Sequence, residues 1–546
     1  MESIIYRDNY ETTIFATKEL KRLMKKAGID SAIKYCNDDN YYGVAIHLIT
    51  TETYNSTIHS NEQVDVDKDG FAIKVNGKET WIIGNKHRSI LYGIYQYCKI
   101  RFGYRWNNLG EELLEEVRVK GVSSLKYEPR FSRRGNIIET IDDVGYINSL
   151  IDWGVKNGHN EYFFTFFLWE KIKSEVSPEL KKRDFQVTLG GHSLGCLLKK
   201  VMGEGLSQAT KFHFFSEGTD VQDKVIDKIV DICKSYSVIK RISLWPEDVK
   251  IEEKSAECFF GPYMRFMERL KAALSEYDLE VEVEHIVYNA GLAWHMLERG
   301  ENVTASEKLD ILYAYWGRDY SEKLNSPDSN QVKALESLKD WNKQAMSRYK
   351  SLTVLEYYSD HFMLTHLFPP LMNRIACDLN DYEDLEIDGV LNLIVPIHKK
   401  GQDPELEGVY PWKCIHHLNN YFYTRLAWGD EFETVKEEYF ADVEDGNWYL
   451  DKITELEHVT AKLTKWNVPL FPARIVDPEK VKLEVPEVQL ELREIYTLIS
   501  SWGLPELEQL IDRFRKDQYG PFTTEEKLLI YFELFKRNSN YYKNLW

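Results

Sequence analysis

Acidic residues follow short apolar runs of this chain at points where a buried strand would end. In the clearest case, the run over residues 238–244 stops at Trp245-Pro246, and Glu247 and Asp248 follow at once. Pro246 has no N–H to donate to a neighbouring strand, so the strand is expected to end there. Glycoside hydrolysis needs two carboxyl groups, one as proton donor and one as base or nucleophile. A strand followed by a solvated acidic turn is the competing interpretation.

A second acidic residue is the predicted partner of this acid pair. Glu356 stands in an apolar run over residues 352–358, beside Tyr357 and another tyrosine. A catalytic acid needs a raised pKa, which aromatic neighbours and a second carboxylate can produce. We therefore predict Glu247, Asp248 and Glu356 as the catalytic carboxylates.

Other polar and aromatic residues at or near the ends of apolar runs are candidates for substrate binding. They are Arg134, His192, Trp245, Tyr288, Asn289, Arg318, Asp319, Tyr357 and Asp388, and Glu139 is a further site candidate without an assigned role. Arg134 is the first choice for binding a carboxylate, although a structural ion pair is the more common role of such an arginine. His192 is either a ligand contact or a residue of a Gly-Gly-His turn, and Arg318 and Asp319 form either a site pair or a surface pair.

Eight strand-like runs alternate with helical stretches, which is typical of βα units and a parallel sheet. The runs cover residues 131–139, 161–167, 185–193, 238–244, 281–288, 309–316, 352–358 and 387–394. This count predicts a (β/α)₈ TIM barrel, in which the active site lies at the C-terminal ends of the strands.

The barrel is expected to follow a small α+β sandwich and to precede a helical region. Residues 17–28 and 89–102 have helical spacing, and residues 42–49, 70–75 and 80–84 are strand-like, with a hairpin turn at Asn76-Gly77. Helical periodicity returns over 432–440, 449–466 and 488–514, and Gly503-Leu-Pro505 is expected to break the last of these stretches. The predicted domains are therefore residues 1–126, 127–430 and 431–546.

Three motifs of the first domain carry a family resemblance. They are Asp69-Gly70-Phe71 in a strand, a Tyr92-Gly-x-Tyr95 pattern in the following helix, and Gly103-x-Arg-Trp106 after it. In this order they resemble the α/β domain that precedes the catalytic barrel in bacterial α-glucuronidases, β-N-acetylhexosaminidases and related uncharacterised glycosidases. The resemblance implies a barrel next and a glycosidase activity.

The same resemblance implies positions for the acids. It implies an acid after the fourth strand, which is Glu247 or Asp248, with Asp319 and Glu356 as base candidates. The hexosaminidases carry Asp then Glu at that place, whereas this chain carries Glu then Asp. Residues 419–430 resemble the junction to a helical tail, which implies helices that pack on the barrel or join a homodimer.

The composition excludes several classes of partner. The chain has 546 residues and a net charge of −19, which argues against nucleic acid or an anionic membrane surface as its main partner. Its 7 cysteines show neither metal-ligand spacing nor a disulfide framework, and no signal peptide or membrane span is visible, so we expect a cytoplasmic protein. No cofactor is expected, and His416-His417 has no partner at metal spacing, so no metal site is predicted.

Residues 191–195 form a literal Gly-x-Ser-x-Gly pattern, which leaves a serine hydrolase as an alternative. The pattern would make Ser193 a nucleophile, but no downstream Asp and His stand out as its partners. The favoured interpretation is an exo-acting glycoside hydrolase that removes a terminal uronic acid or N-acetylhexosamine from an oligosaccharide. A non-catalytic carbohydrate-binding protein on the same fold is the main alternative.

Overall fold

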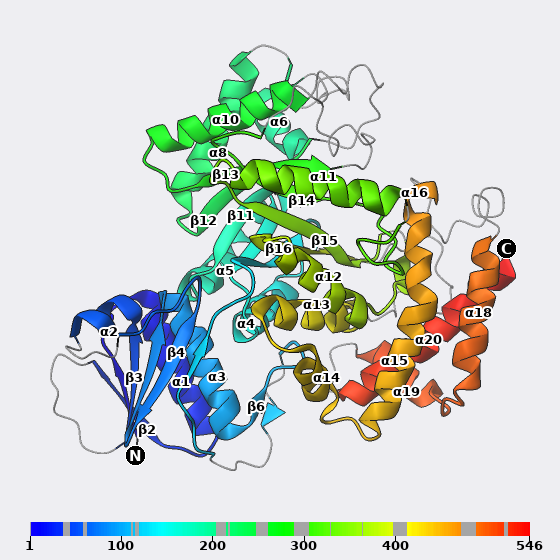
Figure 1. The fold of residues 1–546 in the computed structure, drawn as a ribbon, viewed down its shortest axis with the longest axis horizontal. Helices are drawn as coiled ribbons and strands as arrows, with labels where there is room; N and C mark the ends of the chain where they lie inside the picture. The colour runs from blue at the N-terminus through cyan, green and yellow to red at the C-terminus, as the bar shows by residue number, and fades with distance from the viewer. Residues whose placement is uncertain are drawn as a thin grey trace.

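The structure is a computed structural model with an α/β layer, a closed barrel and a group of C-terminal helices (Figure 1). It describes residues 2–35, 44–57, 63–110, 113–114, 120–203, 214–216, 219–246, 260–288, 305–327, 329–362, 364–396, 412–470, 487–517 and 522–545. Among the helices of these ranges, none is both long and apolar enough to cross a membrane.

The N-terminal part is a six-stranded sheet in the order β2-β1-β3-β5-β4-β8. Its elements are β1 (Glu2–Tyr6), α1 (Glu11–Lys26), β2 (Ser31–Tyr35), β3 (Ala45–Thr50), α2 (Thr51–Thr57), β4 (Phe71–Asn76), β5 (Glu79–Gly84), α3 (His87–Phe102) and β8 (Leu125–Tyr127), with the small pair β6 (Tyr104–Arg105) and β7 (Leu113–Leu114) beside them. The hairpin predicted at Asn76-Gly77 joins β4 and β5 as antiparallel neighbours. Strands β1 and β2 were not predicted, because both are short and lack a clear alternation of apolar and polar residues.

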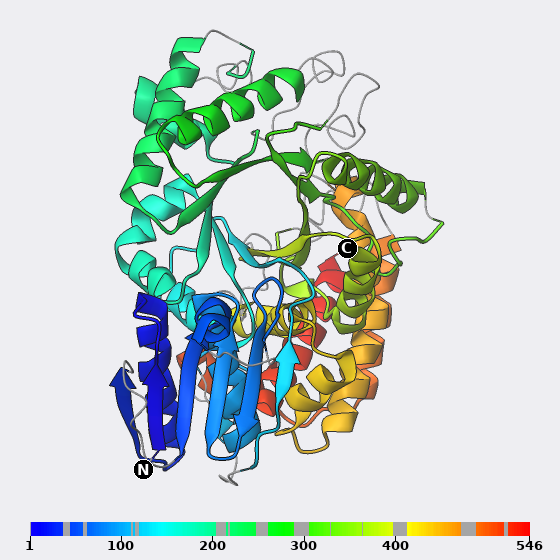
Figure 2. The same ribbon diagram turned by 60° about the vertical axis from the view of Figure 1, so that its left-hand side comes forward.

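The predicted barrel is confirmed: eight parallel strands close into a ring (Figure 2). The strands are β9 (Arg133–Ile138), β10 (Glu161–Thr165), β11 (Gln186–Gly191), β12 (Ile239–Leu244), β13 (Glu282–Tyr288), β14 (Asp310–Ala314), β15 (Leu352–Asp360) and β16 (Gly389–Val395). Each of the eight apolar runs overlaps one of them, although β15 and β16 extend past the predicted ends at residues 358 and 394. The helices around the ring are α4 (Val144–Lys156), α5 (Phe166–Lys182), α6 (Leu194–Met202), α8 (Thr219–Ser235), α10 (Phe260–Glu276), α11 (Ser329–Met346) and α12 (Met372–Asp384), with the short η2 (Thr365–Leu367).

The C-terminal part is helical, as predicted. It contains α13 (Trp412–Trp428), α14 (Phe432–Phe440), α15 (Gly446–Thr460), η3 (Ala461–Trp466), α16 (Asn467–Leu470), α18 (Glu487–Ser501), α19 (Glu508–Lys516) and α20 (Thr524–Leu545). The break predicted at Gly503-Leu-Pro505 is confirmed: it separates α18 from α19, and Gly503 has a positive φ of 64°. The exact domain boundaries and the homodimer stay predictions.

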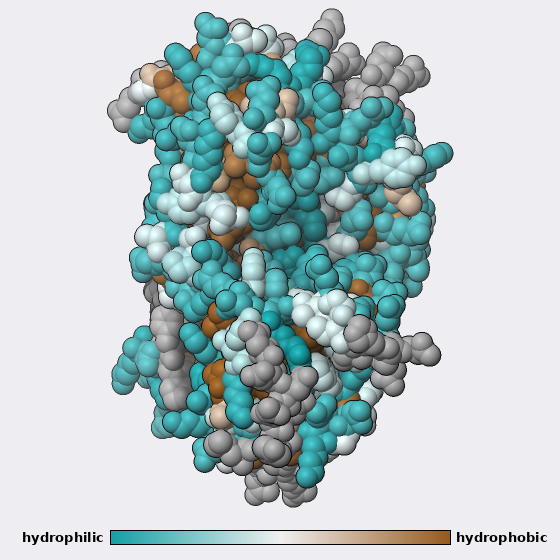
Figure 3. Space-filling model, turned by 90° about the vertical axis from the view of Figure 1, so that its left-hand side faces the viewer, coloured by the Kyte–Doolittle hydropathy of each residue, from teal (hydrophilic) through white to brown (hydrophobic). Residues whose placement is uncertain are grey.

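The surface of the molecule that faces the viewer in Figure 3 is mostly hydrophilic, and its apolar patches are small and separate. This surface fits the strongly acidic composition.

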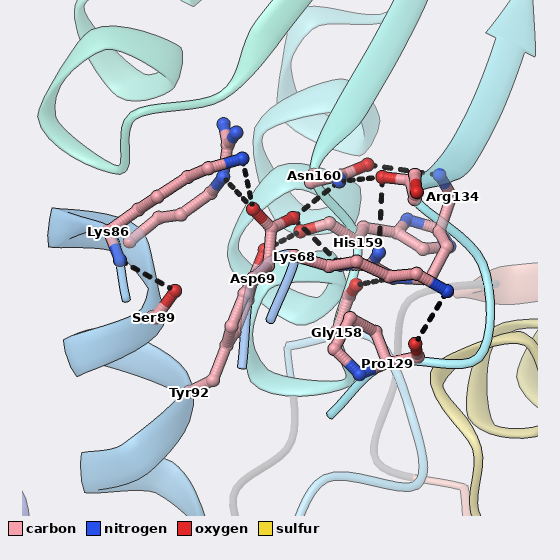
Figure 4. A network of polar contacts seen from close by, with 12 residues as sticks. Lys68, Asp69, Lys86, Ser89, Tyr92, Pro129, Arg134, Gly158, His159 and Asn160 are labelled. Atoms are coloured by element: carbon pink, nitrogen blue, oxygen red, sulfur yellow. Dashed lines mark hydrogen bonds and ion pairs between the residues drawn. The ribbon is translucent and has the colours of Figure 1, made fainter. Parts of the chain in front are cut away.

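One buried carboxylate joins the N-terminal sheet to the barrel (Figure 4). Asp69, which is 1% exposed, accepts from Arg88 of α3 at 3.1 Å and from Arg134 of β9 at 3.1 Å. Asn160, at the start of β10, also donates to it at 2.5 Å. Burial alone would raise the pKa of Asp69, but the charges of Arg88, Arg134 and Lys86 outweigh burial and hold it well below its usual range.

Two glycines of the motifs allow close packing within the N-terminal domain, and a tyrosine contacts the barrel. A Cβ on Gly70 would come within 2.8 Å of the carbonyl oxygens of Asp67 and Tyr127, and one on Gly93 would come within 2.4 Å of Ile82. Both positions therefore need glycine because the backbone is approached closely. The Tyr92 hydroxyl donates to the His159 carbonyl of the barrel at 2.7 Å. Asp69 and Tyr92 thus contact the barrel, whereas Gly70 and Gly93 serve the packing within the domain.

We predict that Asp69→Asn destabilises the protein by about 3–5 kcal/mol at neutral pH, because it leaves buried arginines without their counter-charge. A depressed carboxyl pKa stabilises the fold above the unfolded pKa of about 4, and this contribution is lost as the pH falls below it. Urea unfolding of both proteins should therefore show a difference at pH 7 that shrinks below about pH 4. The control is Asp223→Asn, which removes a solvent-exposed partner of Arg269 and should leave the midpoint unchanged. An equal midpoint for Asp69→Asn and wild type at pH 7 would contradict this role.

Candidate active site

Side chains of each barrel strand alternate between the barrel axis and the surrounding helices. Arg133, at the start of β9, marks the interior, because it donates across the barrel to Glu161 at 2.7 Å, to Glu284 at 2.6 Å and to the Thr353 hydroxyl at 2.8 Å. This buried ionic layer fills the N-terminal end of the barrel. Residues 135, 137 and 139 continue the axis-facing series of β9 toward the C-terminal end.

Glu139 ends this series at the C-terminal end of the barrel. A Cβ on Gly191, the last residue of β11, would lie 3.2 Å from its Oε1 atom. The Thr165 hydroxyl, at the end of β10, donates to the Glu139 carbonyl at 2.7 Å. The carboxylate of Glu139 therefore lies against the ends of the neighbouring strands, where a TIM barrel places its reactive groups.

A bulge in β15 turns a second carboxylate toward the axis. Glu356 pairs with Asn392 of β16, whereas Ser359 pairs with Ile394 and Asp360 with Val395. Three steps along β15 thus match two along β16, so β15 contains one extra residue. Val395 continues the axis-facing series of β16, and Asp360 beside it faces the axis as well. A bulge re-aims the side chains that follow it, and without it Asp360 would face the helices, as Glu356 does.

Asp360 has the surroundings of a proton donor. It is 8% exposed, accepts from the Phe362 N–H at 2.8 Å and also accepts a hydrogen bond from Trp316. Burial raises the pKa of Asp360 to about 6, and the negative charge of Glu139 adds to the increase against these two hydrogen bonds. Two carboxyl groups at one barrel end, one of them with a raised pKa, are the arrangement that acid–base hydrolysis uses.

Three of the predicted substrate-binding residues come together at this end. The His192 ring lies 5.3 Å from the Trp245 ring and 6.0 Å from the Tyr288 ring, centroid to centroid. His192 Nδ1 donates to the Pro246 carbonyl at 2.8 Å, which fixes the orientation of the imidazole. The Trp245 indole N–H donates to Ser243 at 3.0 Å. This aromatic group, with Trp316 on Asp360, provides faces of the kind that pack on sugar CH groups.

Glu356, predicted as a catalytic carboxylate, lies on the other side of β15. Its carboxylate accepts from Arg318 at 3.0 Å, from the Tyr320 hydroxyl at 2.6 Å and from the Tyr382 hydroxyl of α12. Arg318 also pairs with Asp378 of α12 at 2.6 Å. Burial raises the pKa of Glu356. Its side chain points toward the surrounding helices rather than toward the barrel axis. The structure thus corrects the predicted roles of Glu356 and Arg318: both belong to a structural ion cluster.

Two further predictions are wrong, and a third stays a prediction. Arg134 is fully buried on the outer face of β9, where it pairs with Asp69 and lies over the Trp428 ring at 5.1 Å, so it is part of the domain junction. Asp388 precedes β16 and accepts from the Leu352 N–H at 3.0 Å, which places it at the N-terminal end of the barrel. Asp319 lies in the turn after β14, as expected, where it accepts from the Ser321 N–H at 2.9 Å, and its role in substrate binding stays a prediction.

Tyr357 lies within the bulge, where its N–H donates to the Tyr320 hydroxyl at 3.2 Å. Glu247, Asp248 and Asn289 lie outside the described residues, so their roles stay predictions.

The Ser193 hydroxyl donates to the Gly190 carbonyl at 2.6 Å and accepts from the Phe166 N–H at 3.0 Å. Ser193 is fully buried and committed to the backbone, so it does not have the exposed position of a nucleophile elbow. Within the described ranges, no three His, Cys, Asp or Glu side chains come together as metal ligands.

Asp360 was missed because the predicted strand ended at residue 358, two residues too early. If the strand had been predicted to end at residue 360, the rule that selects polar residues at strand ends would have selected Asp360 instead of Glu356. Strict alternation from Glu356 would still have turned Asp360 outward, because the extra residue of the bulge leaves no clear signal in the sequence.

Residues 1–97 match the model of the glycosyl hydrolase family 67 N-terminus. No curated protein matches the sequence. Among solved structures, a GH115 4-O-methyl-α-glucuronidase with specificity for decorated arabinogalactans is 13% identical, with a TM-score of 0.60 over 100% of this chain and 72% of its own. A GH138 enzyme targeting the pectin rhamnogalacturonan II is 11% identical, with a TM-score of 0.58 over 100% of this chain and 69% of its own.

A third similar structure is the GH20 β-N-acetylhexosaminidase from Streptomyces coelicolor A3(2), which is 13% identical with a TM-score of 0.50 over 83% of this chain and 92% of its own. At these identities the likeness establishes the fold. The chain thus combines an N-terminal domain that matches a glycoside hydrolase family model with a barrel like those of glycoside hydrolases.

We predict that Asp360→Asn stabilises the protein at neutral pH. An acid whose pKa rises from 3.8 to about 6 on folding destabilises the fold progressively as the pH rises through that interval. Removing the charge should therefore add on the order of 2–3 kcal/mol to the unfolding free energy above about pH 6 and little below about pH 4. Urea unfolding at pH 4 and pH 7.5 measures this gain, and a variant that is less stable than wild type at pH 7.5 would contradict the environment described for Asp360.

Proposed function

We propose that the protein is an exo-acting glycoside hydrolase, with Asp360 as the proton donor and Glu139 as the base or nucleophile. The observation that carries this proposal is an axis-facing carboxyl group with a pKa of about 6 beside a second carboxylate at the C-terminal end of a barrel. Structural ion pairs in the barrel interior involve arginines, whereas this pair is formed by two acids. Like charges held together are costly and are typical of functional sites.

The chemistry follows from the two protonation states. Protonated Asp360 would give its proton to the glycosidic oxygen as the bond to the sugar breaks, and the carboxylate of Glu139 would either activate water or attack the anomeric carbon. Strands β9 and β15 are separated only by β16, so their backbones lie about 10 Å apart. Inward-pointing side chains from them can approach to about 5–9 Å, the range of both hydrolytic geometries.

The acids predicted after the fourth barrel strand remain part of the proposal. Glu247 and Asp248 follow β12, which lies across the barrel from β16 and therefore opposite the strands that carry Asp360 and Glu139. From there either residue would reach the other side of a bound sugar. In this arrangement one of them competes with Glu139 for the role of base or nucleophile.

The proposed substrate is an oligosaccharide that ends in a uronic acid or an N-acetylhexosamine. Support comes from the family 67 match over residues 1–97 and from neighbours of the same fold described as an α-glucuronidase and a β-N-acetylhexosaminidase. The aromatic group of His192, Trp245 and Tyr288 is suited to hold a sugar ring. A non-catalytic carbohydrate-binding protein is the second candidate, because it would use the same aromatic faces.

Hydrolysis of aryl α-glucuronide, β-N-acetylglucosaminide and β-N-acetylgalactosaminide by wild type and variants tests this proposal. We expect Asp360→Asn and Glu139→Gln each to lower kcat/KM by about a thousandfold on the substrate that wild type cleaves. The Glu247→Gln and Asp248→Asn variants identify which of these acids takes part. The control Asp142→Asn removes an exposed carboxylate, paired with Lys171, that follows β9, and should act like wild type.

Full activity of Asp360→Asn on the substrate that wild type cleaves would contradict the assigned proton donor. The carbohydrate-binding alternative would be established by a different result. In that case the wild-type protein binds an arabinogalactan, pectin or chitin fragment but cleaves none of them, and Asp360→Asn binds the same fragment with unchanged affinity.

A further inference from the structure

The bulge that turns Asp360 inward is fixed from outside the barrel. The Tyr357 N–H, at the bulge, donates to the Tyr320 hydroxyl at 3.2 Å. The next residue, Tyr358, donates its hydroxyl to Asp378 of α12 at 3.2 Å, and its carbonyl accepts from Asn419 of α13 at 2.8 Å. Backbone groups at a bulge lose their regular sheet partners, so these external partners determine its geometry.

The Tyr320 hydroxyl is the centre of these contacts. It accepts from the Tyr357 N–H and donates to Glu356 at 2.6 Å, so the residue before the bulge and the bulge itself are held by one group. Arg318 then connects Glu356 to Asp378 with hydrogen bonds of 3.0 and 2.7 Å. All of these side chains are buried, and hydrogen bonds to charged groups in such surroundings are strong.

Tyr320 is in turn held by the C-terminal helices. Its N–H donates to the Thr464 hydroxyl of η3 at 2.8 Å. Arg374 of α12 donates to the Tyr320 carbonyl at 3.1 Å. Thr464 is fully buried, and its own hydroxyl donates to the Ala461 carbonyl at 2.6 Å, so its lone pair is aimed at Tyr320 by the fold of η3.

The C-terminal helices also fix α12, which supplies Asp378. Glu457 of α15 accepts from the backbone N–H groups of Asn373 at 3.1 Å and Arg374 at 2.9 Å. These two residues are in the first turn of α12, where N–H groups have no partner within the helix. A carboxylate at this position satisfies two orphan N–H groups and interacts favourably with the helix dipole. One helical segment, α15 with η3, thus holds both the loop that carries Tyr320 and the helix that carries Asp378.

We propose that the cluster of Arg318, Tyr320, Glu356, Asp378 and Tyr382 is a positioning cluster that, anchored by α15 and η3, holds the β15 bulge and thereby aims Asp360 at the substrate. This inference rests on the proposed function for Asp360 and assigns a catalytic purpose to the C-terminal helices. The cluster touches no substrate: it acts through the backbone of residues 357–359. If the bulge relaxes, the extra residue of β15 is absorbed and Asp360 turns toward the helices.

The test compares two buried tyrosines of the β14 region. Tyr320→Phe removes the hydroxyl that holds the bulge, whereas Tyr313→Phe removes a buried hydroxyl that donates to the Ala334 carbonyl of α11 at 2.7 Å and has no contact with the cluster. We expect Tyr320→Phe to lower kcat at least tenfold with KM within about twofold, and to move the basic limb of the pH–rate profile to lower pH. Tyr313→Phe should keep wild-type kcat, KM and pH profile.

A second pair tests the role of the C-terminal helices from a distance. Thr464→Val removes the acceptor for the Tyr320 N–H, whereas Thr460→Val removes a buried hydroxyl that donates only within its own helix, to the Leu456 carbonyl at 2.6 Å. We expect a fall in kcat of about threefold or more for Thr464→Val alone. The proposal is overturned if Tyr320→Phe and Thr464→Val match their controls in kcat and pH profile.

A readout without turnover separates this inference from the proposed function. If the cluster holds Asp360 in its buried position, the gain in urea midpoint caused by Asp360→Asn at pH 7.5 should shrink by half or more in the Tyr320→Phe background and remain unchanged in the Tyr313→Phe background. This result would support the positioning cluster even if the protein cleaves no glycoside. An unchanged gain in both backgrounds would refute the cluster whatever the activity.

Discussion

The buried charge of Asp69 is the interaction on which the arrangement of this molecule depends. A carboxylate that is 1% exposed needs counter-charges, and it finds them on α3 and on the first barrel strand. The same requirement explains why Arg134 faces outward from β9 and is committed to the N-terminal sheet. A buried ion group of this kind specifies one orientation, because any other would leave a charge unpaired in a dry environment. The Tyr92 hydroxyl, which donates to the His159 carbonyl of the barrel, adds a second contact at this junction.

The same principle separates the structural acids of the barrel from the reactive ones. Glu161 and Glu284 face Arg133, Glu356 and Asp378 face Arg318, and Asp430 faces Arg425. Asp360 instead has Glu139 as its charged neighbour and two hydrogen-bond donors, Phe362 and Trp316. The fold bears an unfavourable charge at Asp360, which is the usual relation between stability and activity at catalytic sites. In the proposed account, the positioning cluster on the other face of β15 holds Asp360 in this unfavourable environment.

The sequence predicted the barrel, its eight strands and the helical tail, because buried strands and amphipathic helices follow the periodicity of their apolar residues. It also identified His192, Trp245 and Tyr288, which the structure brings together at the ends of three neighbouring strands. It failed for Glu356, because the predicted strand ended two residues early, and for Asp360, because the bulge reverses which of the later residues of β15 face the axis. It failed for Arg134, because the partner of this arginine is 65 residues away in another domain. Long-range pairing and irregular register are the features that local patterns do not encode.

The most direct test of the account is the pH dependence of kcat/KM for the wild-type enzyme on its best glycoside. If Asp360 acts as the proton donor, activity requires its protonated form, so kcat/KM should fall as the pH rises through a pKa of about 6. The fall should be tenfold for each further pH unit. A profile that stays flat to pH 8 would mean that the group with the raised pKa takes no part in the reaction, and would contradict the assignment of Asp360.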